Sequence, residues 1–181
     1  TQPALRRLGM DWMPVLPGVF PPEGQFVEPL LEQALPAVQG GMRVLGMRVL
    51  VPGAGTGIDA VALALRHPEL TVDAFDHYPI AVANTKTLAD LLGVADRVRV
   101  WDADDVDHAA ASGPYDLIVM NAPVPIPQED FEGSTATFNE FDPEGQFIRS
   151  VLKALPTLLT KRGALYLTER GRYRAIRAYE E

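Results

Sequence analysis

Apolar and polar positions follow two alternating patterns from residue 48 onward. Short apolar runs typical of buried strands are mostly followed by longer stretches whose apolar residues recur at three- and four-residue spacing, as in a helix. Because strands that alternate with helices form parallel βαβ units, the pattern predicts a doubly wound, mostly parallel α/β sheet. The predicted strands span 48–51, 71–75, 98–101, 116–120 and 164–168, and the predicted helices span 59–66, 80–92 and 147–159.

The first part of the chain does not fit this alternation. Residues 1–29 contain six prolines, and proline fixes φ and removes a backbone donor, so we predict an irregular arm there. Apolar residues at helical spacing then predict a helix over 28–38. We therefore divide the chain into an amino-terminal arm and helix, 1–40, and a core domain, 41–181.

Composition narrows the class of protein. The chain has 181 residues, 47% of them hydrophobic and 22% charged, which is typical of a single globular domain. No apolar run approaches the roughly 20 residues that cross a bilayer, and no basic segment precedes an apolar one at the start, so we expect a soluble, cytoplasmic protein. There is no cysteine, and His67, His77 and His108 lie far apart, so we expect no metal centre.

Charge is unevenly distributed along the chain. Residues 1–160 contain 10 basic and 21 acidic residues, whereas residues 161–181 contain 6 basic and 3 acidic ones. An acidic body repels a phosphate backbone, so we do not expect a nucleic-acid partner. The basic end is either a solvated segment or a contact for a partner or polyanion, and the sequence leaves both open.

A glycine-rich turn between the first predicted strand and helix is the main candidate for a cofactor site. It reads Pro-Gly-Ala-Gly-Thr-Gly over residues 52–57. Glycine lets the chain turn sharply and lets its backbone approach a ligand closely. The dinucleotide fingerprint Gly-x-Gly-x-x-Gly would place its third glycine at position 58, but the glycine stands at position 57, which favours S-adenosylmethionine over NAD. The candidate cofactor-binding residues are Gly53, Ala54, Gly55 and Gly57, with a simple tight turn as the alternative.

Asp76 supplies a second, matched signal. It ends the second predicted strand, 23 residues after Gly53. An acid at this place accepts hydrogen bonds from both ribose hydroxyls of a nucleotide cofactor. The alternative is a helix cap before Pro79.

These features resemble a Rossmann-like class I S-adenosylmethionine-dependent methyltransferase, and within it the release-factor glutamine methyltransferase (HemK-like) group. That group continues its ribose aspartate as Asp-x-Ser-Pro, and this chain has Asp76-His77-Tyr78-Pro79. The resemblance extends from about Val15 to Arg170. It implies S-adenosylmethionine as cofactor, with Asp104 and Asp105 reading the adenine and His77 along the adenine edge.

A second motif concerns the methyl acceptor. Asn121-Ala122-Pro123-Val124 resembles the Asn-Pro-Pro-Tyr of the group, in which the Asn side chain and a carbonyl fixed by proline orient a planar –NH2 group toward the methyl group. The resemblance implies that Asn121 is the catalytic residue and also borders the cofactor, and that Ala122, Pro123 and Val124 contact the substrate. Because Val124 replaces the aromatic ring and Ala122 the first proline, we expect a small-molecule nitrogen or oxygen nucleophile as acceptor.

The expected function is thus an S-adenosylmethionine-dependent methyltransferase that acts on a small molecule, in natural-product or other biosynthesis. Three alternatives stay open. The first is a tailoring enzyme that uses the bound cofactor to promote a cyclisation or displacement without methyl transfer. The second is a protein glutamine N-methyltransferase, against which the absence of that group's helical recognition domain counts. The third is a non-catalytic cofactor-binding subunit.

Residues 122–145 form a long proline-broken segment with six acidic residues and no Lys or Arg. Segments of this length without regular structure are usually lids or substrate loops. We expect a mobile lid over the acceptor pocket. Its acids either favour a cationic acceptor or are simply solvated.

The end of the chain carries an expectation about partners. A full class I sheet has two further strands beyond the one predicted over 164–168, yet only residues 170–181 follow it. We expect a sheet shortened at this end, whose apolar edge is covered either by the tail as one short strand or by another chain. We also expect association through this strand and the tail, as a homodimer or with a small companion subunit.

Overall fold

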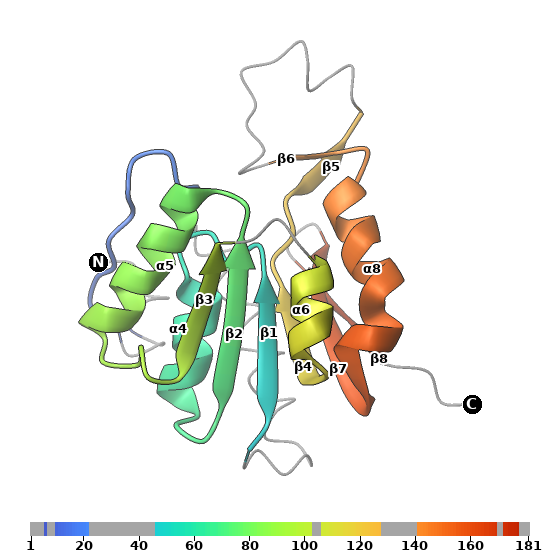
Figure 1. The fold of residues 1–181 in the computed structure, drawn as a ribbon. Helices are drawn as coiled ribbons and strands as arrows, with labels where there is room; N and C mark the ends of the chain where they lie inside the picture. Colours follow the sequence, from blue (N-terminus) through green and yellow to red (C-terminus); the bar gives the residue numbers. More distant parts are fainter. Residues whose placement is uncertain are drawn as a thin grey trace.

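The computed structural model describes residues 6, 10–21, 46–102, 106–127, 141–169 and 172–177. They form a six-stranded sheet in the order β3-β2-β1-β4-β7-β8, flanked by helices (Figure 1). Its strands are β1 Arg48–Pro52, β2 Thr71–Asp76, β3 Val98–Asp102, β4 Tyr115–Met120, β7 Leu159–Glu169 and β8 Arg172–Arg177. The described helices are α4 Ile58–Arg66, α5 Pro79–Leu91, α6 Val106–Ser112 and α8 Gln146–Leu158.

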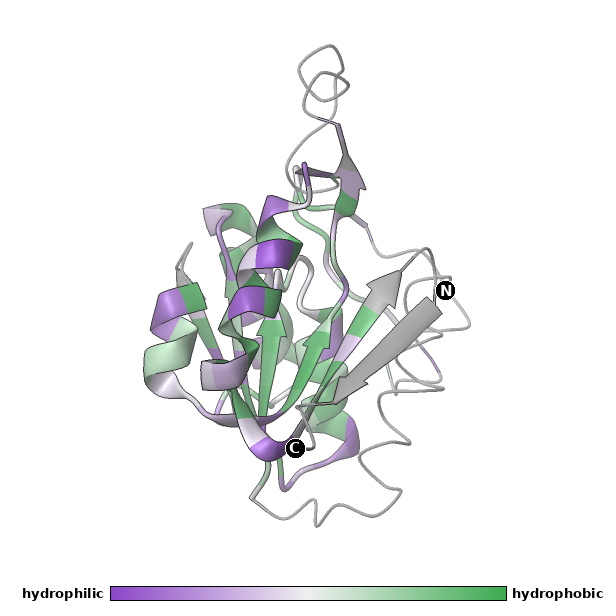
Figure 2. Ribbon diagram, turned by 90° about the vertical axis from the view of Figure 1, so that its right-hand side faces the viewer, coloured by the Kyte–Doolittle hydropathy of each residue, from purple (hydrophilic) through white to green (hydrophobic). Residues whose placement is uncertain are grey.

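The sheet separates two apolar layers. Successive residues of a strand point to opposite faces, so Val49 and Val51 of β1 pack with α4 and α5, whereas Leu50 packs with α6 and α8. Figure 2 shows the hydrophobic colour concentrated on the central strands between these helices. The predicted α/β sheet is therefore confirmed. Within the described residues, no helix is long and apolar enough to span a membrane.

The strand order follows from the pairing of the strands. β1 pairs in parallel with β2 and β4, β2 pairs in parallel with β3, and β4 pairs in parallel with β7. All five predicted strands are present, as are the three helices predicted within the described residues, although several bounds differ by one or more residues. The short helix α6 was not predicted, because Val106 is its one large apolar residue and seven residues give little periodicity.

The edge of β7 is covered by the chain itself. β8 pairs with it in antiparallel fashion, with Leu165 opposite Ile176. Of the two alternatives, the tail that folds back as a strand is confirmed, and an edge covered by another chain is wrong. The expected association through this strand and the tail stays a prediction. β7 begins at residue 159, earlier than predicted. The prediction missed residues 160–163 because they lack the apolar run that is typical of a buried strand. Gly163 permits this path, since a Cβ there would lie 2.9 Å from the carbonyl oxygen of Tyr115.

The segment predicted to be structureless has regular structure at both ends. β5 (Val124–Ile126) pairs in parallel with β6 (Phe141–Pro143), and this small sheet lies beyond the upper edge of the main sheet (Figure 1). Within β6, the carboxylate of Asp142 accepts the backbone N–H groups of Phe147 at 3.0 Å and Ile148 at 3.1 Å, which caps α8. The prediction of an entirely irregular segment is wrong; residues 128–140, the middle of the proposed lid, lie outside the described residues.

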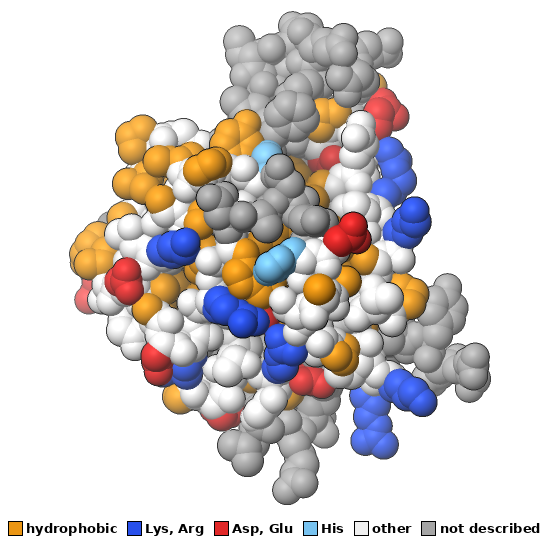
Figure 3. Space-filling model, viewed as in Figure 1, with side chains coloured by type: hydrophobic (Ala, Val, Ile, Leu, Met, Phe, Trp, Pro, Cys, Tyr) orange, Lys and Arg blue, Asp and Glu red, His pale blue; other side chains and the backbone are white. Residues whose placement is uncertain are grey.

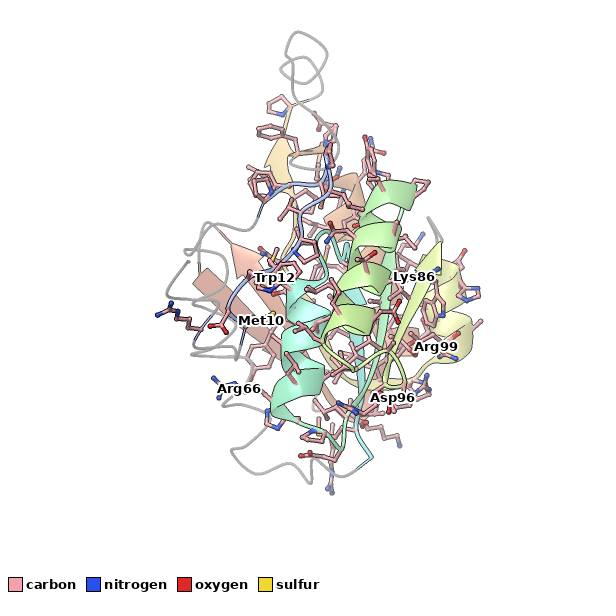
Figure 4. The ribbon with its side chains drawn as sticks, turned by 90° about the vertical axis from the view of Figure 1, so that its left-hand side faces the viewer. Met10, Trp12, Arg66, Lys86, Asp96 and Arg99 are labelled. Carbon is pink, nitrogen blue, oxygen red and sulfur yellow. The ribbon has the colours of Figure 1, made fainter. Side chains whose placement is uncertain are left out.

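The amino-terminal arm packs beside α4 (Figure 4). In residues 10–21 the structure has neither helix nor strand, as the prolines predicted. Met10 and Val19 are buried, and Met10 joins the core cluster of α4 and α5. The helix predicted over 28–38 lies outside the described residues.

A buried carboxylate joins four strands on the other face of the sheet. Asp73 of β2 accepts hydrogen bonds from Arg48 at 3.0 Å, from Arg99 at 2.8 and 2.9 Å, and from the Tyr115 hydroxyl at 3.0 Å. Burial raises the pKa of Tyr115, so its hydroxyl stays a donor. Basic and acidic side chains are interspersed on the face seen in Figure 3.

Asp59 differs from Asp73, because its buried carboxyl has an oxygen without a hydrogen-bond partner among the described residues. It is the second residue of α4 and is 5% exposed, and its Oδ1 has no hydrogen-bond partner in the part of the chain that is described. Burial raises its pKa to about 7.

The wild-type protein should lose stability as the pH rises toward neutrality, because Asp59 then ionises. We expect Asp59→Asn to abolish this loss. The folded protein keeps the proton on Asp59 up to a pKa of about 7, whereas the unfolded chain releases it near 3.8. The stabilising contribution is complete below pH 3.8 and is lost as the pH rises toward 7, by up to about 1.4 kcal/mol per pH unit. In urea unfolding, the wild type should lose about 3 kcal/mol more than the variant between pH 5 and pH 8. Equal losses would contradict the burial of this carboxyl.

Candidate cofactor and acceptor site

Three of the predicted site segments meet where parallel strands end. Pro52 lies opposite Phe75, and Leu50 lies opposite Ile118. The segments that follow β1, β2 and β4 therefore leave the sheet at the same edge, which is the upper edge in Figure 1. Ligands of doubly wound sheets bind at this edge, where the strand order reverses between β1 and β4. The predicted residues gathered there are Gly53, Ala54, Gly55, Gly57, Asp76, His77 and Asn121.

The glycine loop has a shape that only glycines permit. Gly53, Gly55 and Gly57 all have positive φ, of 65°, 54° and 83°. A Cβ on Gly57 would lie 2.8 Å from the Cα atom of Thr85, and one on Gly53 would lie 3.1 Å from the ring of Phe147. Around a Cβ placed on Gly55, by contrast, no atom of the described residues lies within 4 Å. Two glycines thus allow close packing on α5 and α8, and the third leaves room for a ligand.

The carboxylate of Asp76 holds this loop in place. Asp76 is 7% exposed; its Oδ2 accepts the N–H group of Gly55 at 2.8 Å, and its Oδ1 accepts that of Tyr78 at 2.9 Å. The bond to Tyr78 lies at the start of α5, where the cap alternative placed Asp76. The role of Asp76 as a ribose acceptor stays a prediction. Each carboxylate oxygen has two lone pairs, so each retains capacity for one further donor.

His77 lies at the outer border of the loop. Its side chain is half-exposed, and its Nδ1 atom lies 3.6 Å from Oδ1 of Asp76. Its ring meets that of Tyr78 edge-on, with the ring centroids 4.4 Å apart. The predicted adenine readers, Asp104 and Asp105, lie outside the described residues.

The acceptor motif leaves β4 directly. Asn121, Ala122 and Pro123 are partly buried, and Ala122 packs against the core cluster under α8. Val124 begins β5 and is 50% exposed. No aromatic ring therefore stands at the position where the Asn-Pro-Pro-Tyr motif has its tyrosine.

Two polar residues of α5 support the loop and were missed by the sequence analysis. Asn84 donates from Nδ2 to the carbonyl oxygen of Thr56 at 2.8 Å, and the hydroxyl of Thr85 donates to that of Gly55 at 3.3 Å. Both side chains are fully buried. Asn84 and Thr85 are adjacent polar residues inside a helix that was predicted from its apolar spacing. This polar pair is the signal that could have identified them.

The residues present fit the adenosine group of S-adenosylmethionine. Open space at Gly55 permits close approach of a ligand to the backbone, and Asp76 keeps acceptor capacity for hydroxyl groups. Among the described residues, no group of three or more His, Asp or Glu side chains could hold a metal ion.

Comparison with known proteins agrees with this geometry. Residues 28–141 match the family model of the methyltransferase small domain. The chain is 32% identical over 128 residues to the release factor glutamine methyltransferase of Chlorobaculum tepidum, covering 65% of this chain and 43% of that protein. It is 36% identical over 134 residues to the enzyme of the same name from Bordetella pertussis, covering 74% and 47%. The chain thus spans less than half the length of these relatives.

Solved structures show the same fold. The ribosomal protein L11 methylase of Lactobacillus delbrueckii subsp. bulgaricus superposes with a TM-score of 0.56 at 20% identity, over 88% of this chain and 72% of that one. A methyltransferase of Geobacter sulfurreducens, in complex with S-adenosyl-L-homocysteine, superposes with a TM-score of 0.53 at 20% identity, over 93% and 55%. With the family match over more than half of its length, the chain belongs to the methyltransferase small-domain family.

Proposed function

We propose that this domain transfers the methyl group of S-adenosylmethionine to the planar amide nitrogen of a glutamine side chain in a protein. The observation that carries the proposal is the position of Asn121, which leaves β4 at the edge where the glycine loop leaves β1. Pro123 follows it, as a proline does in Asn-Pro-Pro-Tyr. The names of the relatives add support for a glutamine acceptor over the small molecule expected from the sequence.

The cofactor supplies an electrophilic methyl group on a sulfonium. The backbone of Gly53, Ala54, Gly55 and Gly57 would form the wall of the cofactor site, and the spare lone pairs of Asp76 would accept the ribose hydroxyls. His77, which lies beside Asp76, would border the adenine. Each of these residues binds or orients and none reacts.

Asn121 performs the acceptor side of the reaction. Its carboxamide oxygen accepts one N–H of the planar –NH2 group, and the carbonyl beside Pro123 accepts the other. Two such contacts would fix the nitrogen in line with the S–CH3 bond, so the rate gain would come from proximity and orientation. The N–CH3 bond forms as the S–CH3 bond breaks, S-adenosyl-L-homocysteine is the leaving group, and one amide proton is released to solvent.

A small-molecule nitrogen or oxygen nucleophile is the second candidate. Its support is the exposed Val124, together with Ala122, at the positions where the glutamine methyltransferase group has its aromatic ring and first proline. Val124 itself offers no aromatic ring on which a flat amide could stack. A small-molecule acceptor that does not depend on stacking against an aromatic ring suits the surface formed by Ala122 and Val124.

Methyl transfer with labelled S-adenosylmethionine distinguishes the two candidates. One reaction contains glutamine-bearing proteins, and a parallel one contains small amines, amides and hydroxylated metabolites. Label recovered as N-methylglutamine after complete digestion of the protein supports the first candidate. Label confined to the small-molecule fraction overturns it in favour of the second.

We expect Asn121→Ala to lower kcat by about 100-fold, because a misplaced nitrogen loses the alignment of the displacement. The affinity for S-adenosyl-L-homocysteine, measured by calorimetry, should change far less than kcat. A kcat equal to that of the wild type would show that Asn121 does not orient the acceptor.

We expect Asp76→Ala to weaken the binding of S-adenosyl-L-homocysteine by about 1.5 to 3 kcal/mol, because it removes a charged acceptor from two hydroxyl groups. Isothermal titration calorimetry measures this loss. Asp90→Ala is the matched control, since Asp90 is an exposed acid on α5. Equal affinities of the two variants would refute the assignment of the ribose site.

A further inference from the structure

Asn84 of α5 joins three segments that are distant in the sequence. Its carboxamide oxygen Oδ1 accepts the N–H group of Leu16 at 2.7 Å. Its Nδ2 atom donates to the carbonyl oxygens of Pro14, at 3.2 Å, and Thr56, at 2.8 Å. One side chain thus links the amino-terminal arm, helix α5 and the glycine loop.

The environment of Asn84 makes these bonds consequential. The residue is 0% exposed, so water cannot replace a lost partner. Its two N–H donors are both used, and its oxygen accepts one bond. A buried polar group left without its partner costs far more than an exposed one. The arm and the loop are therefore held together through a single carboxamide.

The arm turns sharply just after this contact. The N–H group of Val19 donates to the carbonyl oxygen of Leu16 at 3.0 Å, and Gly18 between them has a φ of 91°. Pro17 and Gly18 are the residues preferred at the two central positions of a type II turn. Val19 is buried beyond the turn, and Met10 is buried before the contact. The arm is thus fixed on both sides of residues 14–16, which favours a defined docked position.

The loop end of the link lies next to the cofactor site. Thr56, whose carbonyl receives the Asn84 bond, lies between Gly55 and Gly57. Gly55 donates its N–H group to Asp76, and Gly57 abuts Thr85 on α5. A displacement of Thr56 therefore moves the stretch of backbone that leaves open space for a ligand.

We propose that Asn84 is a positioning residue of the cofactor site and that arm residues 14–19 belong to this site, because docking of the arm and the shape of the glycine loop are coupled through the Asn84 carboxamide. The inference depends on the cofactor of the family and not on the acceptor, so it is tested without methyl transfer.

The first test removes the arm's donor and leaves α5 unchanged. Leu16→Pro deletes the N–H group that donates to Asn84, whereas the control Leu16→Ala shortens the side chain and keeps the N–H group. We expect Leu16→Pro to raise the calorimetric Kd for S-adenosyl-L-homocysteine about tenfold, and Leu16→Ala to leave it within about twofold.

Hydrogen exchange of the cofactor-free protein provides a readout besides binding. In the Leu16→Pro protein, exchange should accelerate in the arm and also at the amides of Gly55 and Gly57. Faster exchange in the arm alone, with normal loop protection and normal affinity, overturns the proposal.

The second test alters the link from the helix side. Asn84→Ala should raise the Kd about tenfold or more. Thr87→Ala is the control, because Thr87 is an exposed residue of α5 whose hydroxyl bonds only to Ala83 of the same helix. If the two segments are coupled, the double variant Asn84→Ala, Leu16→Pro binds about as weakly as Asn84→Ala alone. Multiplied effects of the two changes would show independent roles and overturn the proposal.

Asn84→Ala deletes a fully buried group and is the variant at risk of failing to fold. In that case the Leu16 pair decides, since position 16 is only partly buried and lies in an irregular stretch. Equal affinities of Leu16→Pro and Leu16→Ala would then overturn the coupling.

Discussion

The cofactor edge of the sheet depends on one carboxylate that accepts two backbone N–H groups. Asp76 bonds to Gly55 on the loop and to Tyr78 at the start of α5, so the end of β2 holds the elements on both sides of it. Gly57 completes the arrangement, because its lack of a side chain lets the loop lie directly on Thr85. The loop is therefore shaped by bonds within the protein, and a ligand meets a backbone that folding has already ordered.

Two other buried carboxyls show that burial alone does not decide the electrostatics of this fold. Asp73 and Asp59 are similarly inaccessible. Asp73 faces Arg48 and Arg99, which balance its charge and join the strands on the face opposite α4. Asp59 has no such partner among the described residues, and burial raises its pKa to about 7. The sheet is thus secured below the cofactor edge by a paired charge, while the first turn of α4 carries an unpaired group that weakens the fold as the pH rises.

The sequence was sufficient for the features whose determinants are local. The glycine spacing and Asp76 predicted the loop and its neighbouring strand, and alternating apolar runs predicted the five parallel strands. β8 was harder, because its basic and apolar residues suit a helix as well as a strand and its state depends on pairing with β7. Asn84 was hidden for the same reason, since its partners lie 28, 68 and 70 residues away. Features that depend on distant hydrogen bonds leave no periodic signal in the chain.

The acceptor and cofactor sides of the site are mechanically linked through one end of α8. β5, which continues the acceptor motif, pairs with β6, and Asp142 of β6 caps α8 at Phe147. The Phe147 ring in turn lies against Gly53 of the cofactor loop and meets Phe75 edge-on. A change in the acceptor segment therefore reaches the loop through three short-range contacts, each between parts that pack closely. The arm contacts the same loop through Asn84. The glycine loop is therefore supported by both the arm and α8, and its geometry depends on both.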